Sequence, residues 1–307
     1  MKKVSVITVN YNQPQVTETL LKSIAEYNKY PLVQIVVVDN GSRVDPVPDW
    51  RQRYPQHTFL RSEINRGFAG GNNEGIRLAD GEYLFFVNND TEFTEGLIES
   101  LVALLDQHPA IGMISPKIRY FDQPQIIQYA GFTPMEYNTA RNKCIGEFEP
   151  DNGQYDHTTG KTGFIHGAAM MVRRSAMEKA GLMFESFFLY YEEMDWCERI
   201  RNSGFEIWLE PRALIYHKES VSVGKKSALK EYFMNRNRIL FIRRNAPSFS
   251  KYIFYSYFAA VVFPRNMFRY ILEKRYDLAR QLIRAVKWNL SHDKNSTDLG
   301  YPVHKIT

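Results

Sequence analysis

The chain has 307 residues, of which 44% are hydrophobic and 14% aromatic, a composition that is typical of globular proteins and excludes an intrinsically disordered chain. Its two cysteines, Cys144 and Cys197, are too few for a disulfide framework or a zinc knuckle, so we expect a reducing compartment. The formal net charge is +5, and no window holds the roughly 18 apolar residues that a membrane-spanning helix needs.

The first half of the sequence alternates between short apolar runs and segments with helical spacing. Strands are predicted at 4–9, 33–39, 57–62, 83–87 and 111–116, and helices at 14–27, 70–79 and 94–107. Strands that alternate with helices predict an α/β fold with a mostly parallel central sheet flanked by helices.

The second half begins with residues 117–162, which are irregular and rich in Gly, Pro, Asn and Tyr, and which we interpret as an excursion that lies over a site. The elements expected after it are a strand at 163–172, helices at 174–180 and 192–202, strands at 205–209 and 213–216, a loop at 218–226, and helices at 227–244, 249–263 and 265–290. The last of these is predicted to be a basic amphipathic helix.

Positive charge is concentrated in the C-terminal third of the chain. Residues 218–307 carry 18 Lys and Arg against 6 Asp and Glu, whereas residues 1–217 carry 21 against 28. The basic tail predicts an anionic partner surface, either membrane or nucleic acid, or else a solvated helical face. Nucleic acid is the weakest of these interpretations, because the basic residues are mixed with a continuous apolar face rather than with exposed aromatic residues.

Polar residues follow two of the buried strands at the point where each strand ends. Asn88, Asn89 and Asp90 come after the strand at 83–87, and Asp39 ends an earlier strand. Open α/β sheets bind ligands at this carboxyl edge, where Asp39 can accept hydrogen bonds from a nucleotide and Asp90 can ligate a divalent metal. Such residues also simply end strands and cap turns, and the two motifs alone leave both interpretations open.

A glycine-rich segment precedes the helix predicted at 70–79. Gly67, Gly70 and Gly71 lie within Asn65–Asn73, so backbone N–H groups at the start of the helix can face a phosphate. The spacing matches neither a P-loop nor the dinucleotide-binding fingerprint. A tight turn is the alternative explanation for any one of these glycines.

Acidic residues are clustered where the helix at 192–202 begins. Glu192, Glu193 and Asp195 follow an apolar run of five residues. A favourable interaction with the helix dipole explains part of this cluster. Three acids in four residues exceed that need, and one of them can act as a general base on an incoming hydroxyl.

His217 and two arginines are further candidates. His217 ends the strand at 213–216, which predicts that it shares a metal with Asp90, and Mn²⁺ or Mg²⁺ suits that ligand set. A lone histidine is nevertheless more often structural. Arg236 and Arg238 lie in a helical pattern and suit bidentate phosphate contact, with a solvated helix face as the alternative for at least one of them.

These motifs are more specific together, in their order along the chain, than any of them is alone. The ordered set comprises Thr8–Asn12, Val38–Ser42, Asn65–Asn72, Asn88–Asp90, His166–Ala168, Glu192–Asp195 and His217. It resembles the family-2 inverting glycosyltransferases, which have a GT-A fold, and within them most closely the bacterial rhamnosyltransferase branch. The resemblance covers roughly residues 3–245.

The resemblance implies a role for each matching position. The residues expected to bind the nucleotide-sugar are Thr8, Asn10, Asn12, Asp39, Asn65, Arg66, Gly70, Gly71, Asn72, Asn89, His166, Gly167 and Arg236. Glu193 matches the catalytic base, with Asp195 in support, and Asn88, Asp90 and His217 match the metal ligands. Asn88 departs from the family pattern, in which many members have Asp, because an amide supplies an oxygen ligand without charge.

The resemblance also implies a domain organisation and a reaction. Residues 1–245 are expected to form the catalytic domain, and residues 246–307 a C-terminal helical extension. The expected reaction moves a sugar from a nucleotide-sugar donor to a saccharide or lipid-linked saccharide acceptor, with inversion at the anomeric carbon. It would serve cell-surface polysaccharide synthesis. L-rhamnose from dTDP-L-rhamnose is the first choice of donor, and a UDP-sugar is the alternative.

The expected location is the cytoplasm. The extension is predicted either to lie on the anionic inner face of the cytoplasmic membrane or to pack on the catalytic domain or on a second copy in a homodimer. Two other classes share some of these features. A sugar nucleotidyltransferase needs a cation-bearing glycine-rich loop after the first strand, which Asn10–Pro14 does not offer. An inactive nucleotide- or saccharide-binding relative is favoured by Asn88 and disfavoured by the acidic cluster at 192–195.

Overall fold

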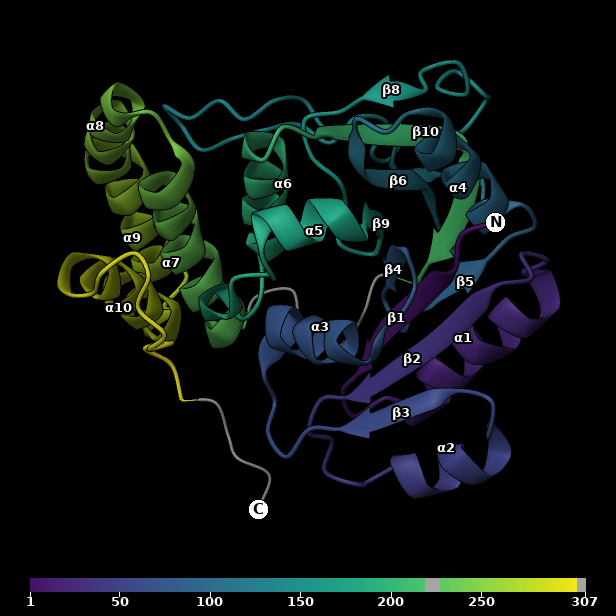
Figure 1. The fold of residues 1–307 in the computed structure, drawn as a ribbon. Coiled ribbons are helices and arrows are strands. Elements are labelled where there is room, and N and C mark those ends of the chain that lie inside the picture. The colour runs from purple at the N-terminus through teal and green to yellow at the C-terminus, as the bar shows by residue number, and fades with distance from the viewer. Residues whose placement is uncertain (219–226, 303–307) are drawn as a thin grey trace.

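In the computed structural model, which describes residues 1–218 and 227–302, a ten-stranded sheet runs through the protein (Figure 1). The strands are β1 (Val4–Asn10), β2 (Val33–Asp39), β3 (Thr58–Arg61), β4 (Tyr83–Val87), β5 (Thr91–Phe93), β6 (Ile111–Tyr120), β7 (Ile127–Tyr129), β8 (Gly160–Lys161), β9 (Ala169–Arg173) and β10 (Glu206–His217). Their order is β3-β2-β1-β4-β9-β6-β10-β5, with β7 paired to β6 and β8 paired to β10.

Helices cover both faces of this sheet. They are α1 (Pro14–Tyr27), α2 (Val47–Arg53), α3 (Gly67–Leu78), α4 (Leu97–Gln107), α5 (Arg174–Ala180), α6 (Glu192–Asn202), α7 (Ala228–Asn245), α8 (Ser248–Tyr257), α9 (Phe263–Leu272) and α10 (Tyr276–Ser291). A short 3₁₀ turn at Glu185–Phe187 precedes α6, and a π-helical segment at Phe258–Val262 joins α8 to α9. The predicted α/β fold with C-terminal helices is therefore confirmed.

The apolar runs form buried strands because their side chains alternate between two hydrophobic cores. In β4, Tyr83, Phe85 and Val87 belong to the core that includes side chains of α1, α2 and α4. Leu84 and Phe86 point to the opposite face, where the core includes side chains of α3, α5, α6 and α7. Burial on both faces explains why the strand has no polar position until it ends.

The sheet is mixed, where the sequence predicted a mostly parallel one. β3, β2, β1 and β4 are parallel neighbours, and so are β6 and β10. β9 runs antiparallel to both β4 and β6. The chain leaves β6 and returns into β9 at the same edge of the sheet, a connection that needs no crossover helix. As a result, the start of β9 lies beside the end of β4, where Ala169 pairs with Val87.

Several predicted elements have different bounds in the structure. The strands expected at 205–209 and 213–216 are one strand, β10, with an irregularity between Glu210 and Leu214. The region expected to be irregular contains the end of β6 together with β7 and β8. The single helix expected at 265–290 is two helices, because Lys274 adopts a left-handed backbone with φ 54°. The loop expected at 218–226 lies outside the described residues, apart from its first position.

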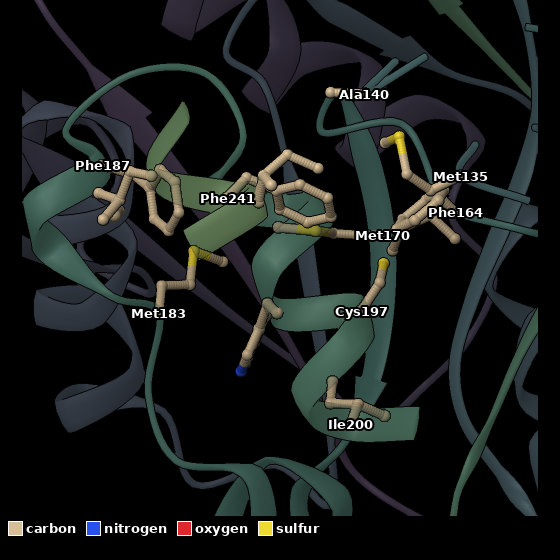
Figure 2. Packing of buried hydrophobic residues seen from close by; sticks show 14 of the residues in the cluster. Met135, Ala140, Phe164, Met170, Met183, Phe187, Cys197, Ile200 and Phe241 are labelled. Atoms are coloured by element: carbon tan, nitrogen blue, oxygen red, sulfur yellow. The ribbon is translucent and has the colours of Figure 1, made fainter. Parts of the chain in front are cut away.

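The C-terminal helices pack beside the sheet and share its core (Figure 1). Phe241 of α7 lies among Phe187, Met183 and Met170, as Figure 2 shows. Residues of α8, α9 and α10 extend the same cluster, namely Phe254, Tyr270, Leu278, Leu282 and Trp288. Across the described part of the chain, every helix is too short or too polar to cross a bilayer.

Candidate active site

The carboxyl edge of the sheet gathers most of the residues that the sequence singled out. β1 ends at Asn10, β2 at Asp39, β4 at Val87 and β10 at His217. Because β9 is antiparallel to β4, the residues before β9 lie at this edge too, and the N–H of Asn88 donates to the carbonyl of Ala168 at 2.9 Å. Motifs from five separate segments therefore meet at one edge.

A cavity of about 600 Å³ opens at this edge and is called here the edge cleft. Five of the predicted site residues line it, namely Asn65, Asn72, Asn88, Asn89 and Asp90. The rest of the lining comprises Val9, Tyr11, Gln13, Asn40, Gly67, Phe68, Val87, Phe188, Leu189, Tyr190, Leu229, Lys230, Tyr301 and Pro302. Tyr11, Asn40 and Phe68 sit inside the predicted motifs, whereas no sequence signal pointed to Lys230 or Tyr301.

Asp39 lies beneath the edge cleft rather than in its lining. Its carboxylate is fully buried and accepts hydrogen bonds from Asn10 Nδ2 at 2.7 Å, from the Ser42 hydroxyl at 2.5 Å and from the Ser42 N–H at 3.1 Å. Asn10 in turn accepts from the Thr17 hydroxyl at 2.9 Å. This buried network fixes the turn after β2, so that Asn40, the next residue, faces the cleft.

The other members of the first motifs support the same turn. The N–H of Asn12 donates to the Ser42 hydroxyl at 2.8 Å, and the Asn12 side chain accepts from the N–H of Arg43 at 2.9 Å. The hydroxyl oxygen of Thr8 is buried and has no hydrogen-bond partner among the described residues. Arg66 reaches out to Glu74 at 3.5 Å and does not line the cleft.

Gly70 and Gly71 lie inside α3 and not in a loop before it. A Cβ on Gly71 would come 2.8 Å from a methyl of Val9, and one on Gly70 would come 2.6 Å from Cβ of Arg66. Gly71 therefore allows α3 to pack closely on β1, and Gly70 leaves room for the Arg66 side chain. These two positions thus lie in a helix and not in a tight turn, and their predicted contact with the nucleotide stays a prediction.

The segment Ser186–Tyr191 forms one wall of the edge cleft in an unusual backbone conformation. Phe188, Tyr190 and Tyr191 have φ values of 60°, 72° and 73°, in the left-handed region that disfavours side chains. Phe188 also accepts a hydrogen bond from the N–H of Phe68 at 2.7 Å. At the start of α3, Gly67 lies so close that any side chain there would overlap the Phe188 carbonyl.

Two consecutive residues of α7 hold this segment from beneath. The side-chain nitrogen of buried Asn237 lies 2.7–2.8 Å from the carbonyl oxygens of Phe187, Leu189 and Tyr190. Arg236 donates to the Ser186 carbonyl and to Asn237 Oδ1, and its guanidinium stacks on Trp288. Burial lowers the pKa of Arg236 to about 10. Arg236, predicted to contact phosphate, is placed here as a support of the cleft wall.

Asp90 and His217 form a close pair at the bottom of the edge cleft. Oδ1 of Asp90 lies 3.1 Å from Nε2 of His217, and the amide nitrogen of Asn88 lies 3.4 Å from the same atom. Nδ1 of His217 lies 2.8 Å from the amide oxygen of Gln128. Since an amide oxygen only accepts, Nδ1 carries a proton and Nε2 can present its lone pair.

This pair has the chemistry of a divalent cation site. Both carboxylate oxygens of Asp90 are buried, and neither accepts a hydrogen bond from any described residue. A buried carboxylate without donors that faces an imidazole lone pair needs a positive charge between them. Among the described residues no group of three His, Cys, Asp or Glu side chains is placed to hold a metal, so the set consists of Asp90, His217 and the Asn88 amide.

His166 packs against the Asp90–His217 pair. Its ring lies edge-on to that of His217, with 5.9 Å between the centroids, and its Nδ1 accepts from the N–H of Ala168 at 3.1 Å. Burial, together with the neighbouring His217, lowers the pKa of His166 to about 3. His166 is therefore neutral and serves as a wall beside the pair.

Glu193 is the accessible member of the acidic cluster. Glu192 is buried, whereas Glu193 keeps part of its surface exposed in the first turn of α6. A Cβ on Gly167 would come 3.9 Å from the Glu193 carboxyl and 3.7 Å from the ring of Phe68, which lines the edge cleft. Burial raises the pKa of Glu193 to about 7, a value that suits a general base.

Asp195 faces the C-terminal helices instead of the edge cleft. Its fully buried carboxylate accepts from Arg199 at 2.8 Å, from Arg244 at 2.9 Å and from Asn245 at 3.0 Å. Its position fixes α6 to the end of α7. Asp195 can thus support Glu193 indirectly, by fixing the orientation of the helix that carries both residues. This support stays a prediction.

Comparison with known proteins decides the family. Residues 5–181, more than half of the chain, match the model for Glycosyl transferase family 2. The chain belongs to this family. It is a glycosyltransferase with a GT-A-like fold, as the ordered motifs predicted.

Similar proteins are named as sugar transferases. The chain is 29% identical over 244 residues to the low-salt glycan biosynthesis hexosyltransferase Agl10 of Haloferax volcanii, covering 77% of this chain and 74% of the relative. It is 26% identical to the N-acetylglucosaminyl-diphospho-decaprenol L-rhamnosyltransferase of Mycobacterium tuberculosis, covering 73% of this chain and 78% of that relative. Its fold resembles the mannosyltransferase PcManGT of Pyrobaculum calidifontis, solved with GDP-Man and Mn²⁺, with a TM-score of 0.55, 16% identity and coverage of 94% and 87%.

We expect Gly67→Ala to destabilise the protein more than the matched substitution Gly96→Ala. Both glycines have left-handed backbones, with φ of 69° and 73°. An alanine in that conformation costs roughly 1–2 kcal/mol. At Gly67 the added Cβ also overlaps the Phe188 carbonyl, and overpacking adds roughly 1–3 kcal/mol. At Gly96 no described atom lies within 4 Å. Urea unfolding measures both losses, and equal losses would contradict the close approach at Phe188.

Proposed function

We propose that this glycosyltransferase moves a sugar from a nucleoside-diphosphate donor in the edge cleft to an acceptor hydroxyl, with inversion at the anomeric carbon. The observation that carries the proposal is the position of Glu193. Its carboxyl lies beside the cleft, keeps part of its surface exposed and has a pKa raised to about 7. At neutral pH a large fraction of such a carboxyl is ionised and can accept a proton.

The lining of the edge cleft supports a donor whose base and ribose lie near Tyr11, Asn40 and Asn65. The side-chain nitrogen of Asn40 donates to Asn65 Oδ1 at 3.1 Å, which joins the two amides into one polar wall. Lys230 enters the cleft from α7 and lies 5.8 Å from the ring centre of Tyr190. An ammonium group there suits a diphosphate. We propose dTDP-L-rhamnose as the donor, with a UDP-sugar as the alternative.

Asp90, His217 and Asn88 would hold a divalent metal, Mn²⁺ or Mg²⁺. Two features of this chain support that assignment. The buried Asp90 oxygens accept no hydrogen bond from a described residue, and the Gln128 amide oxygen accepts the proton of His217 Nδ1, which leaves the lone pair on Nε2. When bound, such an ion neutralises charge on the diphosphate leaving group. The neutral Asn88 amide supplies an oxygen without adding charge.

In the proposed reaction Glu193 removes the proton from the acceptor hydroxyl. The hydroxyl oxygen forms a bond to the anomeric carbon from the face opposite the diphosphate. The bond between that carbon and the diphosphate oxygen breaks, and the electron pair leaves with the nucleoside diphosphate. Neutral His166 and the tightly held Phe188–Tyr190 wall orient the donor, while Glu192, whose pKa burial raises well above its usual range, stays protonated.

The proposed acceptor is a saccharide on a lipid carrier, in cell-surface glycan synthesis. The M. tuberculosis relative is named for a diphospho-decaprenol acceptor. On this chain, α8 and α9 expose large apolar side chains beside basic ones, with Phe249, Tyr252, Phe268 and Leu272 more than 60% exposed. An exposed apolar and basic face suits attachment to the surface of an anionic membrane, which we propose for these helices.

Glu193→Gln should lower the rate of transfer by roughly 10²–10⁴-fold, the usual contribution of a general base, while nucleotide affinity is unchanged. Glu192→Gln is the matched control, because a buried protonated carboxyl and an amide have the same shape and charge, and it should keep most of the activity. Turnover with the purified protein, donor and a saccharide acceptor measures both. Near-normal turnover in the Glu193 variant would remove it from the reaction.

The pH profile should follow the same carboxyl. Burial raises the pKa of Glu193 to about 7, and the base is active only when deprotonated. The rate constant kcat/KM should therefore rise as pH increases through about 7 and level off above it. Measuring kcat/KM between pH 5 and 9 in overlapping buffers tests this. A rate that is flat across pH 6–8 would contradict a general base of this pKa.

Asp90→Ala should weaken Mn²⁺-dependent binding of the nucleoside diphosphate by at least roughly tenfold. Mutating a residue that only hydrogen-bonds to a metal ligand already lowers metal affinity by about that factor. Asp80→Ala is the control, since Asp80 pairs with Lys3 at the opposite edge of the sheet. Calorimetric titration with Mn²⁺ and with EDTA separates the metal-dependent part. Equal affinities for the two variants would show that Asp90 holds no metal.

A donor screen tests the proposed function most directly. Saturating donor at 100 times its Kd should stabilise the folded protein by about 2.7 kcal/mol. The panel is dTDP-L-rhamnose, UDP-glucose, UDP-galactose, UDP-N-acetylglucosamine and GDP-mannose, each with Mn²⁺ in a thermal-shift experiment. A shift with one dTDP- or UDP-sugar would support the donor assignment. A shift with GDP-mannose alone, or with none, would contradict it.

A further inference from the structure

A second cavity, of about 360 Å³, lies among α7, α9 and the chain around residue 141, and four arginines line it. They are Arg141, Arg238, Arg265 and Arg269, and the cavity is called here the arginine pocket. The acidic residue in its lining is Glu231, whose carboxylate accepts from the Asn235 amide at 2.7 Å. Four guanidinium groups thus face one carboxylate that is already engaged.

The described lining of the arginine pocket carries more positive than negative charge, because Glu231 is its acidic residue against four arginines. None of its four arginines forms an ion pair there. The acceptors that they have are neutral: Arg238 donates to the Thr139 carbonyl, Arg265 to Asn266 Oδ1 at 3.4 Å and Arg269 to the Tyr270 hydroxyl at 3.0 Å. The Nε of Arg238 is buried without a hydrogen-bond partner. Burial lowers the pKa of Arg238, and the neighbouring charges of Arg141 and Arg265 lower it further. Like charges held together in this way are stabilised by a bound anion.

The arginine pocket and the edge cleft share one wall. Tyr190 lines the edge cleft and Tyr191, the next residue, lines the arginine pocket. Tyr191 is also the residue immediately before α6, two positions before Glu193. An anion in the arginine pocket therefore lies across the Tyr190–Tyr191 wall from the edge cleft.

The surroundings of the arginine pocket indicate an amphiphilic ligand. On α9, Arg265 and Arg269 alternate at helical spacing with Phe268, Ile271 and Leu272, which are 65%, 50% and 66% exposed. Residues three and four apart are neighbours on a helix surface, so cationic groups at the pocket adjoin an exposed apolar surface. A small anionic group attached to a hydrocarbon chain matches both parts, whereas a free nucleotide matches only the first.

We propose that the arginine pocket binds the diphosphate of a lipid-linked acceptor, with the exposed apolar side chains of α9 against its lipid chain. The proposal rests on the proposed transferase function and adds a binding site for the acceptor that is separate from the donor cleft. The guanidinium groups give bidentate contacts to phosphate oxygens. The saccharide attached to this diphosphate would extend past Tyr191 towards Glu193.

The test uses the full-length protein in nonionic detergent with geranylgeranyl diphosphate as the probe and geranylgeraniol and inorganic diphosphate as comparisons. The test variant is Arg265→Glu/Arg269→Glu. The control is Arg280→Glu/Lys287→Glu, which makes the same change of charge at exposed positions of α10. Binding is measured by calorimetry in EDTA, which removes the metal on which diphosphate binding in the edge cleft is proposed to depend, so that the probe does not bind there. Circular dichroism checks that both variants are folded.

We expect the wild type and the control to bind geranylgeranyl diphosphate with equal affinity, and the test variant to bind at least roughly tenfold more weakly, as the loss of charged hydrogen bonds predicts. Geranylgeraniol and inorganic diphosphate should each bind more weakly than the probe. Equal binding by the two variants would overturn the site. Equal affinity for inorganic diphosphate and the probe would overturn a lipid-linked ligand, and equal affinity for geranylgeraniol would overturn a role for the diphosphate.

The result is distinguishable from failure of the proposed function. Mn²⁺-dependent binding of the nucleoside diphosphate reports on the edge cleft and should be the same in both double variants. Loss of probe binding in the Arg265/Arg269 variant, with nucleotide binding unchanged, supports the arginine pocket. Absence of nucleotide binding in the wild type would contradict the donor site and leave the probe result as a separate measurement of the pocket.

Discussion

The contact on which the site depends most is the hydrogen bonding of Asn237 to the carbonyls of Phe187, Leu189 and Tyr190. That segment includes left-handed residues at Phe188, Tyr190 and Tyr191, and each such non-glycine position costs of order 1–3 kcal/mol. A buried amide that reaches three carbonyls offsets this cost only in one conformation. The same conformation puts Tyr190 in the edge cleft and starts α6 at Glu192, so it also sets the place of Glu193.

The helix that carries Asn237 therefore belongs to the active site as much as the sheet does. Along α7, Lys230 enters the edge cleft, Arg238 lines the arginine pocket and Arg244 binds the buried Asp195 of α6. The helices beyond residue 245 support α7 in turn, because Phe254, Leu282 and Trp288 lie in the same hydrophobic cluster. Removing them would expose this core, so a membrane role for α8 and α9 has to be tested by surface substitutions rather than by truncation.

The sequence predicted the positions of residues that lie at strand ends and helix starts. It did not predict the direction in which their side chains point. Asp90, Asn65 and Glu193 are placed by the boundaries of regular elements, which apolar patterns locate well. Asp39 lies at the predicted strand end, but its carboxylate accepts hydrogen bonds from Asn10 and Ser42. A carboxylate at a turn can accept hydrogen bonds from buried groups as easily as from a ligand. Arg236 is buried because its partners, the Ser186 carbonyl and the Trp288 ring, lie about 50 residues away in the sequence. The left-handed backbone of Lys274, which separates α9 from α10, has no signal in the apolar pattern.

In the function that we propose, the two cavities bind negative charge by different means. The charged side chains in the described lining of the edge cleft are Lys230 and Asp90, whose opposite charges sum to zero. A diphosphate there therefore lacks a counter-charge unless a cation binds beside Asp90. The arginine pocket has four guanidiniums against Glu231 and needs no metal. A donor diphosphate has to leave with the reaction, whereas an acceptor diphosphate has to stay in place. A cation shared with the leaving group suits the first, and fixed arginines on the protein suit the second.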